Sequence, residues 1–322
     1  MSAGTPGARS GTSTWVAFRL GHMGDCALMT GVLDHWRRTR GLGFIVVTRP
    51  GMAPLFAGHP AVQKVRVVDE TRLRARDWWA QAGELARRYE GLGLLDLHGT
   101  LRSAMLCTRW LGPVRRYPKH GLTRRLHRRT RLDALARRLE RTNVPQRYAL
   151  ALEDTPPPAA ELAPRIRLEP GEDAAAEALL ASRGLLDPFV ALHPYATHPD
   201  KAWPREHWLR LTELLADAGL DWAVVGRGEE PLLPGDMRDL TDATDLRLTC
   251  AVLARARALV TNDSGPMHLA TAVGTPVTAL FGPTARAWGF YPSGPRDRVL
   301  ERALTCRPCS LHGATPCARG RA

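Results

Sequence analysis

Short apolar runs alternate with helix-like segments along the whole chain, and this alternation limits the possible folds more than any other feature. Apolar runs bounded by turn residues are typical of buried parallel strands, and the segments between them have one apolar helical face. Such an order predicts α/β architecture, with helices covering parallel sheets. The chain has 322 residues, of which 44% are hydrophobic. It is too long for one compact core, so we expect two domains.

Proline-rich sequence interrupts the alternation once, near the middle of the chain. Residues 153–165 contain three consecutive prolines and a fourth at Pro164, a composition typical of a linker. Strands are expected at 14–18, 44–48, 65–68, 92–97 and 114–117, then at 189–192, 222–225, 258–260 and, last, 277–281. The predicted organisation is a disordered N-terminus at 1–13, a Rossmann-like domain at 14–152, a linker at 153–168, a second Rossmann-like domain at 169–305 and a cysteine-containing tail at 306–322.

Charge and composition argue against a membrane-spanning, secreted or disulfide-rich protein and point to an anionic partner. The sequence has no apolar run of about 18 residues that could span a bilayer, and residues 1–14 lack the apolar centre of a signal peptide. Six cysteines in a chain of this length do not suggest a disulfide framework, so the cytoplasm is the expected compartment. The formal charge of +13 implies an anionic partner: nucleic acid, an anionic membrane face or a phosphorylated substrate.

The segment 258–273 reads as a strand, a polar turn and a helix. Asp263 or Ser264 can cap that helix, and Pro266 suits its first turn. Free backbone N–H groups and the positive end of the helix dipole make such a turn suitable for a phosphate or diphosphate. His268 lies in the first turn and faces the same space. The alternative is an ordinary strand–helix turn with a surface histidine.

Two further loops in the second half follow strand ends. The loop after strand 189–192 contains Lys201, which supplies a point charge to a phosphate. The loop after strand 222–225 contains Glu229 and Glu230, either of which could accept hydrogen bonds from ribose hydroxyls. Three such loops at the carboxyl ends of one sheet predict a nucleotide site.

The first half offers acidic candidates at the same kind of position. Gly21, Gly24 and Asp25 follow the first strand, and the glycines permit a tight turn and close approach of a ligand. The pattern is neither G-x-G-x-x-G nor a P-loop. Asp96 and Arg102 surround the end of the fourth strand, so a cleft shared with Asp25 is plausible. The alternatives are capping aspartates and a solvated arginine.

A basic segment and a cysteine cluster stand apart from these strand ends. Residues 115–141 hold eleven Arg or Lys against two acids, with one aromatic residue. Single-stranded nucleic-acid grooves usually interleave aromatics, so this segment better suits phosphates, carboxylates or an anionic membrane face, unless it is simply a solvated helix. In the tail, Cys306, Cys309 and Cys317 could hold zinc with His312, but the spacing fits no zinc module, and we expect reduced thiols and no metal.

Taken together, the motifs resemble glycosyltransferase family 9, the ADP-heptose:lipopolysaccharide heptosyltransferases. The resemblance covers about residues 14–317, and the chain departs from the family pattern at Gly31, often Pro, and at Ala196, one of two usual threonines. The matching segments are 19–25 (R-x-G-x-x-G-D), 96–103 (D-x-x-G-x-x-R-S), 201–204 (K-x-W-P), 262–270 (containing D-S-G-x-x-H-x-A) and 281–284 (F-G-P-T).

The resemblance implies a GT-B fold, in which two Rossmann-like domains face each other across a cleft, and an inverting sugar transfer without metal or cofactor. It implies an ADP-sugar donor, a lipopolysaccharide core or lipid A acceptor, and peripheral contact with the anionic inner membrane face, with no nucleic acid. By position, the implied residues are Asp25 as general base; Thr197, Lys201, Glu229, Asp263, Ser264, Gly265 and His268 for the donor; and Gly24, Asp96 and Arg102 for the acceptor.

Two other functions remain open on the sequence alone. One is a non-catalytic protein that binds anionic polymers or membranes on the same fold. The other is a sugar-nucleotide epimerase of similar architecture, which would need acid–base groups on both sides of the sugar. The presence of Asp25, Lys201 and His268 favours a transferase.

Overall fold

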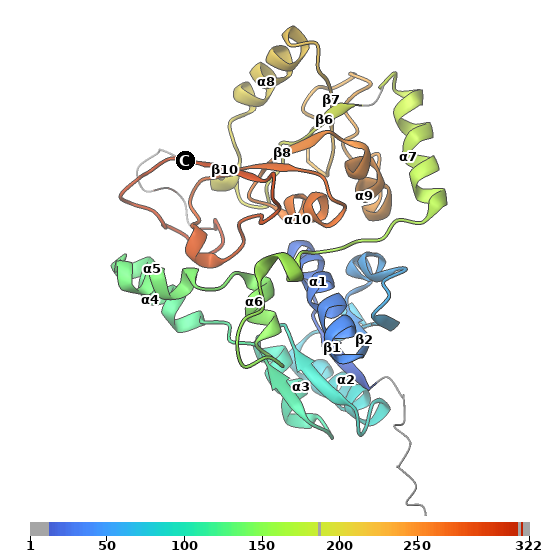
Figure 1. The fold of residues 1–322 in the computed structure, drawn as a ribbon, viewed down its shortest axis with the longest axis vertical. Helices are drawn as coiled ribbons and strands as arrows, with labels where there is room; N and C mark the ends of the chain where they lie inside the picture. Colours follow the sequence, from blue (N-terminus) through green and yellow to red (C-terminus); the bar gives the residue numbers. More distant parts are fainter. Residues whose placement is uncertain (1–12, 186–187, 315–316, 318–322) are drawn as a thin grey trace, which may run out of the picture.

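The computed structural model describes residues 13–185, 188–314 and 317, and these form two parallel sheets, each flanked by helices (Figure 1). The expected N-terminal disorder at 1–13 concerns residues that, except for Ser13, lie outside the described part. The strand order is β3-β2-β1-β4-β5 in the first sheet and β10-β9-β8-β6-β7 in the second. Every paired strand runs parallel to its neighbour. The predicted α/β class is therefore confirmed.

The first sheet and its helices account for the N-terminal half of the chain, in blue and green in Figure 1. Its strands are β1 (Thr14–Phe18), β2 (Gly43–Thr48), β3 (Val62–Val67), β4 (Gly93–Asp96) and β5 (Val114–Arg116). Its α-helices and 3-10 turns are α1 (Met23–Arg40), η1 (Pro50–Phe56), η2 (Glu70–Arg72), α2 (Ala75–Arg88), α3 (Leu101–Arg109), α4 (Gly121–Thr130), α5 (Asp133–Glu140) and α6 (Val144–Ala149).

The second sheet occupies the other half, in yellow to red. Its strands are β6 (Phe189–His193), β7 (Asp221–Val224), β8 (Ala258–Asn262), β9 (Val277–Phe281) and β10 (Arg298–Glu301). Its α-helices and 3-10 turns are α7 (Pro170–Ser182), η4 (Pro199–Lys201), α8 (Arg205–Asp217), α9 (Leu246–Arg255), α10 (Gly265–Ala272) and η5 (Arg286–Trp288). The 3-10 turn η3 (Ala159–Leu162) lies in the segment that joins the two halves.

The strands expected from apolar runs are present, with ends that differ by a few residues. The expectation that 277–281 is the last strand is wrong, because β10 follows it and pairs with β9. β10 lies at the edge of the sheet, and only Val299 of its four residues is half-buried. An edge strand with this composition lacks the apolar pattern on which the prediction depended.

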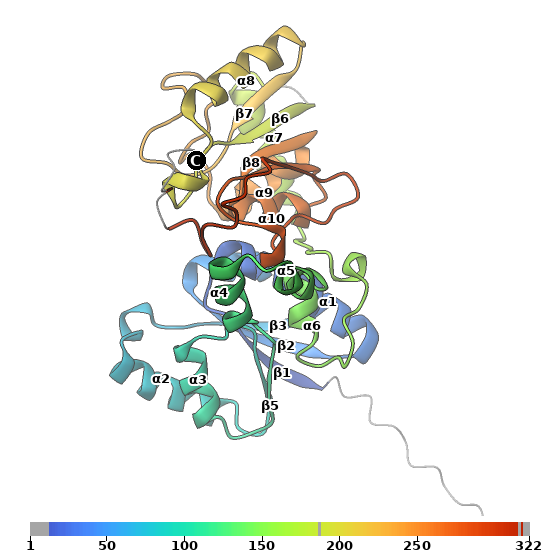
Figure 2. The ribbon, with the colours of Figure 1, turned by 90° about the vertical axis from the view of Figure 1, so that its left-hand side faces the viewer.

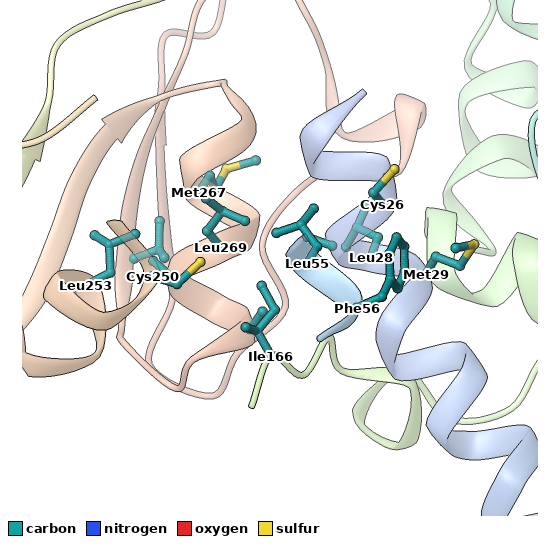
Figure 3. Packing of buried hydrophobic residues seen from close by; sticks show 14 of the residues in the cluster. Cys26, Leu28, Met29, Leu55, Phe56, Ile166, Cys250, Leu253, Met267 and Leu269 are labelled. Carbon is teal, nitrogen blue, oxygen red and sulfur yellow. The ribbon is translucent and has the colours of Figure 1, made fainter. Parts of the chain in front are cut away.

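The two halves meet where α1 packs against α10. One cluster of buried apolar residues runs through this contact and includes Leu28 and Met29 of α1, Leu55 of η1, and Met267 and Leu269 of α10 (Figure 3). Because β1 leads into α1 and β8 leads into α10, this packing brings the loops after the two strands together. The position of the site therefore follows from the helix contact.

The segment 153–168 packs against α1. Its residues Leu162 and Ile166 are buried, and η3 contacts α1. A Cβ atom at Gly31 of α1 would lie 2.2 Å from the carbonyl oxygen of Ala163. Gly31, a departure from the family pattern, therefore lets this backbone approach the helix closely. Figure 2 shows the segment beside α1 and α6.

Candidate active site

Asp25 is held by two buried side chains from other parts of the chain. It is the third residue of α1, whose cap position belongs to His22. Its carboxylate forms an ion pair with Arg19 and accepts a hydrogen bond of 2.8 Å from the hydroxyl of Tyr148 in α6. Arg19 is fixed in turn by the carbonyl oxygens of Leu97, at 2.6 Å, and Gly21, at 2.8 Å. Asp25 is therefore an oriented carboxylate, and the helix-cap alternative does not describe its contacts.

The surroundings of Asp25 decide its charge. Burial alone would raise the pKa of this carboxyl, but the Arg19 charge and the Tyr148 hydrogen bond outweigh burial, so the pKa lies below its ordinary value. The converse holds at Tyr148, where burial raises the pKa of the phenol well above its ordinary value. At neutral pH the pair is a carboxylate and a protonated phenol, so Tyr148 donates and Asp25 accepts.

The turn between β8 and α10 is built on Asn262. This side chain is fully buried, donates to the Pro194 carbonyl at 2.8 Å and accepts from the Trp203 N–H at 2.9 Å. It thereby ties the loop after β6 to the turn. Ser264 occupies the cap position of α10 and Gly265 begins the helix. The turn has the strand–helix form predicted for binding a phosphate group.

A cation and an anion lie together beside that turn. Lys201 Nζ is 2.7 Å from Asp263 Oδ2 and 3.2 Å from the Asp263 carbonyl oxygen. Asp263 also accepts a hydrogen bond of 2.7 Å from Thr284, the threonine of the F-G-P-T segment. The K-x-W-P, D-S-G and F-G-P-T segments, far apart in sequence, therefore meet through three side chains.

The starts of α1 and α10 approach each other at Gly24 and His268. A Cβ atom at Gly24 would lie 2.5 Å from Cδ2 of His268, so no larger residue fits without displacing the ring. His268 is 4% exposed, and burial lowers its pKa to about 4. The imidazole is therefore neutral at pH 7, and it can donate or accept a hydrogen bond but supplies no charge.

Two cavities adjoin this contact. The first, of about 480 Å³, is lined by Asp25 on one side and by Lys201, Asp263 and His268 on the other, with Trp288 and Phe290 among its walls. The second, of about 540 Å³, is lined mainly by residues of the second half, including Tyr195, Arg227, Leu246 and Gly265, with Met23 and Met52 from the first half. The residues that line both are His22, Gly24, Thr197 and Ser264. The start of α10 thus lies between the cavity that contains Asp25 and Lys201 and the slightly larger second cavity.

Three predicted residues lie apart from these cavities. Asp96 is 1% exposed, accepts the N–H groups of His98 and Gly99, and pairs with Arg116 at 3.0 Å. It shapes the loop after β4. Arg102 donates to the Leu73 carbonyl at 2.9 Å. Glu229 is exposed in the loop after β7. None of the three lines either cavity.

Sequence reasoning missed several residues of the site. Tyr148 and Trp288 were not proposed, because one lies in a short helix and the other in a 3-10 turn, without a motif around them. Among the described residues, no group of three or more His, Cys, Asp or Glu side chains is arranged to hold a metal ion. No helix in the described ranges is long and apolar enough to cross a membrane.

A sequence model of glycosyltransferase family 9 (heptosyltransferase) matches residues 84–315, well over half of the chain. The chain belongs to this family. It is therefore a glycosyltransferase, as the motifs predicted. The match includes the Lys201, Asp263 and His268 segments but begins after Asp25.

Curated relatives agree with the family. Lipopolysaccharide heptosyltransferase 1 of Pseudomonas aeruginosa is 30% identical over 303 residues, which cover 87% of this chain and 81% of the relative. Lipooligosaccharide heptosyltransferase 2 of Haemophilus influenzae is 34% identical over 178 residues, which cover 48% of this chain. That alignment spans half the length of the Haemophilus protein.

Solved structures support the GT-B architecture. A family 9 glycosyltransferase from Veillonella parvula has a TM-score of 0.70 at 19% identity, covering 90% of this chain and 86% of that one. ADP-heptose lps heptosyltransferase II of E. coli has a TM-score of 0.64 at 21% identity, covering 91% of each chain. The predicted GT-B fold, with two Rossmann-like units that face each other, is therefore confirmed for this family 9 protein.

Proposed function

We propose that this family 9 protein transfers a heptose, or a related sugar, from an ADP-sugar to the inner core of lipopolysaccharide, with inversion at the anomeric carbon. One observation carries the proposal: Asp25 faces Lys201 and His268 across a single cavity. The names of the relatives support the choice of sugar and acceptor. We expect residues 14–152 to bind the acceptor and 169–305 to bind the donor.

The chemistry follows from the positions of the charges. An acceptor hydroxyl loses its proton to the Asp25 carboxylate as its oxygen forms a bond to the anomeric carbon. The bond from that carbon to the β-phosphate oxygen breaks, and the electron pair leaves with ADP. Lys201 and the start of α10 stabilise the negative charge on the leaving oxygen. In this scheme the lysine and the helix dipole do the work of a divalent cation, so we expect activity to persist in EDTA.

The nucleoside fits the second cavity and the sugar fits the first. Thr197 and Ser264 line both spaces, so a diphosphate bound at the start of α10 would lie between them. Tyr195 and Leu246 supply apolar surface for a base. We further propose a cytoplasmic enzyme that works at the membrane surface, where a lipid-linked acceptor is presented.

The test is to incubate the purified protein with ADP-heptose and a lipopolysaccharide truncated before its first heptose. Mass spectrometry of the acceptor should show the gain of one heptose residue, and the anomeric proton coupling of the product should show inversion. A series of other sugar nucleotides tests the donor. If no sugar nucleotide adds mass to any truncated core, the proposed function is wrong. Isomerisation of the donor without an acceptor would indicate the epimerase instead.

A further inference from the structure

Helix α4 buries basic side chains and exposes leucines, the reverse of an ordinary surface helix. Its buried residues are Arg124 and His127, with 8% and 5% of their surface exposed, whereas Leu122 is 81% and Leu126 is 49% exposed. A soluble helix usually buries its leucines and exposes its charges. Scattered exposed leucines need no explanation, but a helix that exposes its leucines while it buries its charged side chains does.

The buried polar face has a clear role in the fold. The Arg124 guanidinium lies 5.2 Å from the centre of the Trp288 ring and 5.9 Å from that of Phe290. The His127 ring packs edge-on against Trp288 at 5.8 Å. Since Trp288 and Phe290 line the cavity that contains Asp25, these contacts fix α4 to the wall of the site and oblige its leucines to point away.

The exposed face combines apolar and basic residues in a continuous stripe. Leu122, Arg125, Leu126 and Arg129 are all exposed and follow the i, i+3, i+4, i+7 spacing of one helical face. Leu132, just before α5, is 56% exposed. The sequence of α4 contains no acidic residue. Leucines with arginines around them on one face are typical of helices that lie in the headgroup region of an anionic bilayer.

This stripe is continuous with the active site. Arg125, Arg128 and Arg129 line a shallow hollow together with Leu311 and His312. Leu311 and His312 also line the cavity that contains Asp25. α4 and α5 project at the side of the molecule in Figure 1 and face the viewer in Figure 2, level with the junction of the two halves. A surface that contacted this stripe would therefore lie at the mouth of the cavity.

We propose that the α4 stripe, Leu122, Arg125, Leu126 and Arg129, docks on an anionic lipid bilayer and holds the mouth of the cavity at the membrane surface. The leucines enter the interface between headgroups and acyl chains, and the arginines pair with lipid phosphates. The inference rests on the proposed function in one respect: a lipid-linked acceptor gives the docking its purpose. Binding to lipid can nevertheless be measured without any sugar transfer.

The experiment is vesicle sedimentation with the full-length protein and vesicles of phosphatidylcholine alone or with one quarter phosphatidylglycerol, at low and high salt. The wild type should sediment with the anionic vesicles and much less with the neutral ones, and high salt should weaken this binding. Arg125→Gln with Arg129→Gln should reduce the partition coefficient by about 30-fold, as expected for two basic side chains near an anionic surface. Leu122→Ser with Leu126→Ser should also reduce it clearly.

Matched variants separate the stripe from general surface effects. Leu214→Ser with Leu300→Ser removes two leucines of the second half that are 48% and 54% exposed. Arg87→Gln with Arg88→Gln removes two exposed charges at the end of α2. Both controls should bind like the wild type. Equal loss in controls and α4 variants, or unchanged binding in the leucine pair, would overturn the proposal. So would a dimer of the wild type that the leucine pair dissociates, because the stripe would then join two copies.

A transfer assay distinguishes this inference from the proposed function. The leucine pair should keep wild-type transfer to a water-soluble core acceptor without acyl chains, and lose transfer to the same core anchored in anionic vesicles. Anionic binding through the stripe without any transfer would refute the proposed function and leave the docking intact. Transfer to both acceptors that is insensitive to the leucine pair would support the proposed function and refute the docking.

Discussion

Tyr148 donates a 2.8 Å hydrogen bond to Asp25 across 123 residues of sequence. The bond joins α6 to the start of α1, and both side chains are buried or nearly so. Arg19 lies on the other carboxylate oxygen and 5.7 Å from the centre of the Tyr148 ring. The three side chains therefore form one unit in which the tyrosine and the arginine fix both the direction and the charge of the carboxylate.

Tyr148→Phe should move the acid limb of the kcat/KM profile to higher pH. The hydrogen bond favours the charged carboxylate and contributes to the lowered pKa of Asp25, so its removal raises that pKa. Asp25 must be ionised to accept a proton, and activity is therefore lost at a higher pH in the variant. At neutral pH the variant should keep most of the wild-type kcat, because Asp25 is still ionised there.

Tyr291→Phe is the matched control for this change. The hydroxyl of Tyr291 donates to the Glu301 carboxylate, a phenol–carboxylate pair outside the cavity that contains Asp25. Its removal should leave the acid limb in place. An acid limb that does not move in Tyr148→Phe would show that the tyrosine serves only the packing of α6.

The part of the site that the sequence predicted is the part built from strand ends. Asp25, Lys201 and Ser264 each follow or lie near the carboxyl end of a parallel strand, and the topology of a parallel sheet brings such ends to one edge. The family motifs then assigned roles to them. This reasoning needs no knowledge of side-chain contacts, so it was sufficient for the fold and for bringing Asp25, Lys201 and Ser264 to one cavity.

What the sequence did not reveal depends on packing between distant segments. Tyr148 reaches Asp25 because α6 packs on α1. Trp288 is held at the cavity wall by Arg124, by His127 and by its own hydrogen bond to the Ser310 carbonyl. The role of Asp96 was also out of reach: a carboxylate at a strand end can face a cleft or close its own loop, and here it binds His98 and Gly99. The local sequence pattern is the same for an aspartate that faces a cleft and for one that closes its own loop.

Gly24→Ala should reduce transfer strongly while the protein still folds. The added methyl group would lie 2.5 Å from the His268 ring, so α1 and α10 must separate or the ring must move. Overpacking of this kind typically costs about 1–3 kcal/mol. Gly171→Ala is the control, since Gly171 is likewise the second residue of its helix and has open space around it. Thermal melting and kcat/KM should both change little in that control.

Lys201→Ala and Asp263→Asn should change ADP affinity in opposite directions. Lys201 contributes charge to the diphosphate, so its loss should weaken binding at least fivefold, the equivalent of about 1 kcal/mol. Asp263 neutralises Lys201 at 2.7 Å, so Asn there should strengthen ADP binding while keeping an acceptor for Thr284. Calorimetry with ADP is the measurement, with the exposed Asp217→Asn as control. Weaker ADP binding in Asp263→Asn would argue against competition for the lysine.

The stability of the protein should fall between about pH 6.5 and pH 4. Burial lowers the pKa of His98 to about 3 and those of His193 and His268 to about 4. In this range the unfolded chain, with ordinary histidine pKa values near 6.5, binds protons that the folded chain does not, so acid favours unfolding. Each histidine contributes up to about 1.4 kcal/mol per pH unit. Urea unfolding at pH 7.5, 6 and 5 measures the effect, and His98→Gln should reduce the slope. Constant stability over this range would contradict the burial of these neutral rings.

Asp25→Asn should lower kcat at least about 10²-fold and leave ADP affinity nearly unchanged. Asparagine keeps the size of the side chain and can still accept from Tyr148, but it cannot take the proton of a sugar hydroxyl. Asp34→Asn is the matched control, because Asp34 is a buried aspartate of the same helix, 5% exposed and 3.1 Å from Arg38. Single-turnover transfer, ADP calorimetry and thermal melting on both variants separate chemistry from folding. An equal loss of activity in the two variants would show that the loss comes from an arginine beside α1 that has lost its carboxylate partner. An active Asp25→Asn variant would show that another group is the base.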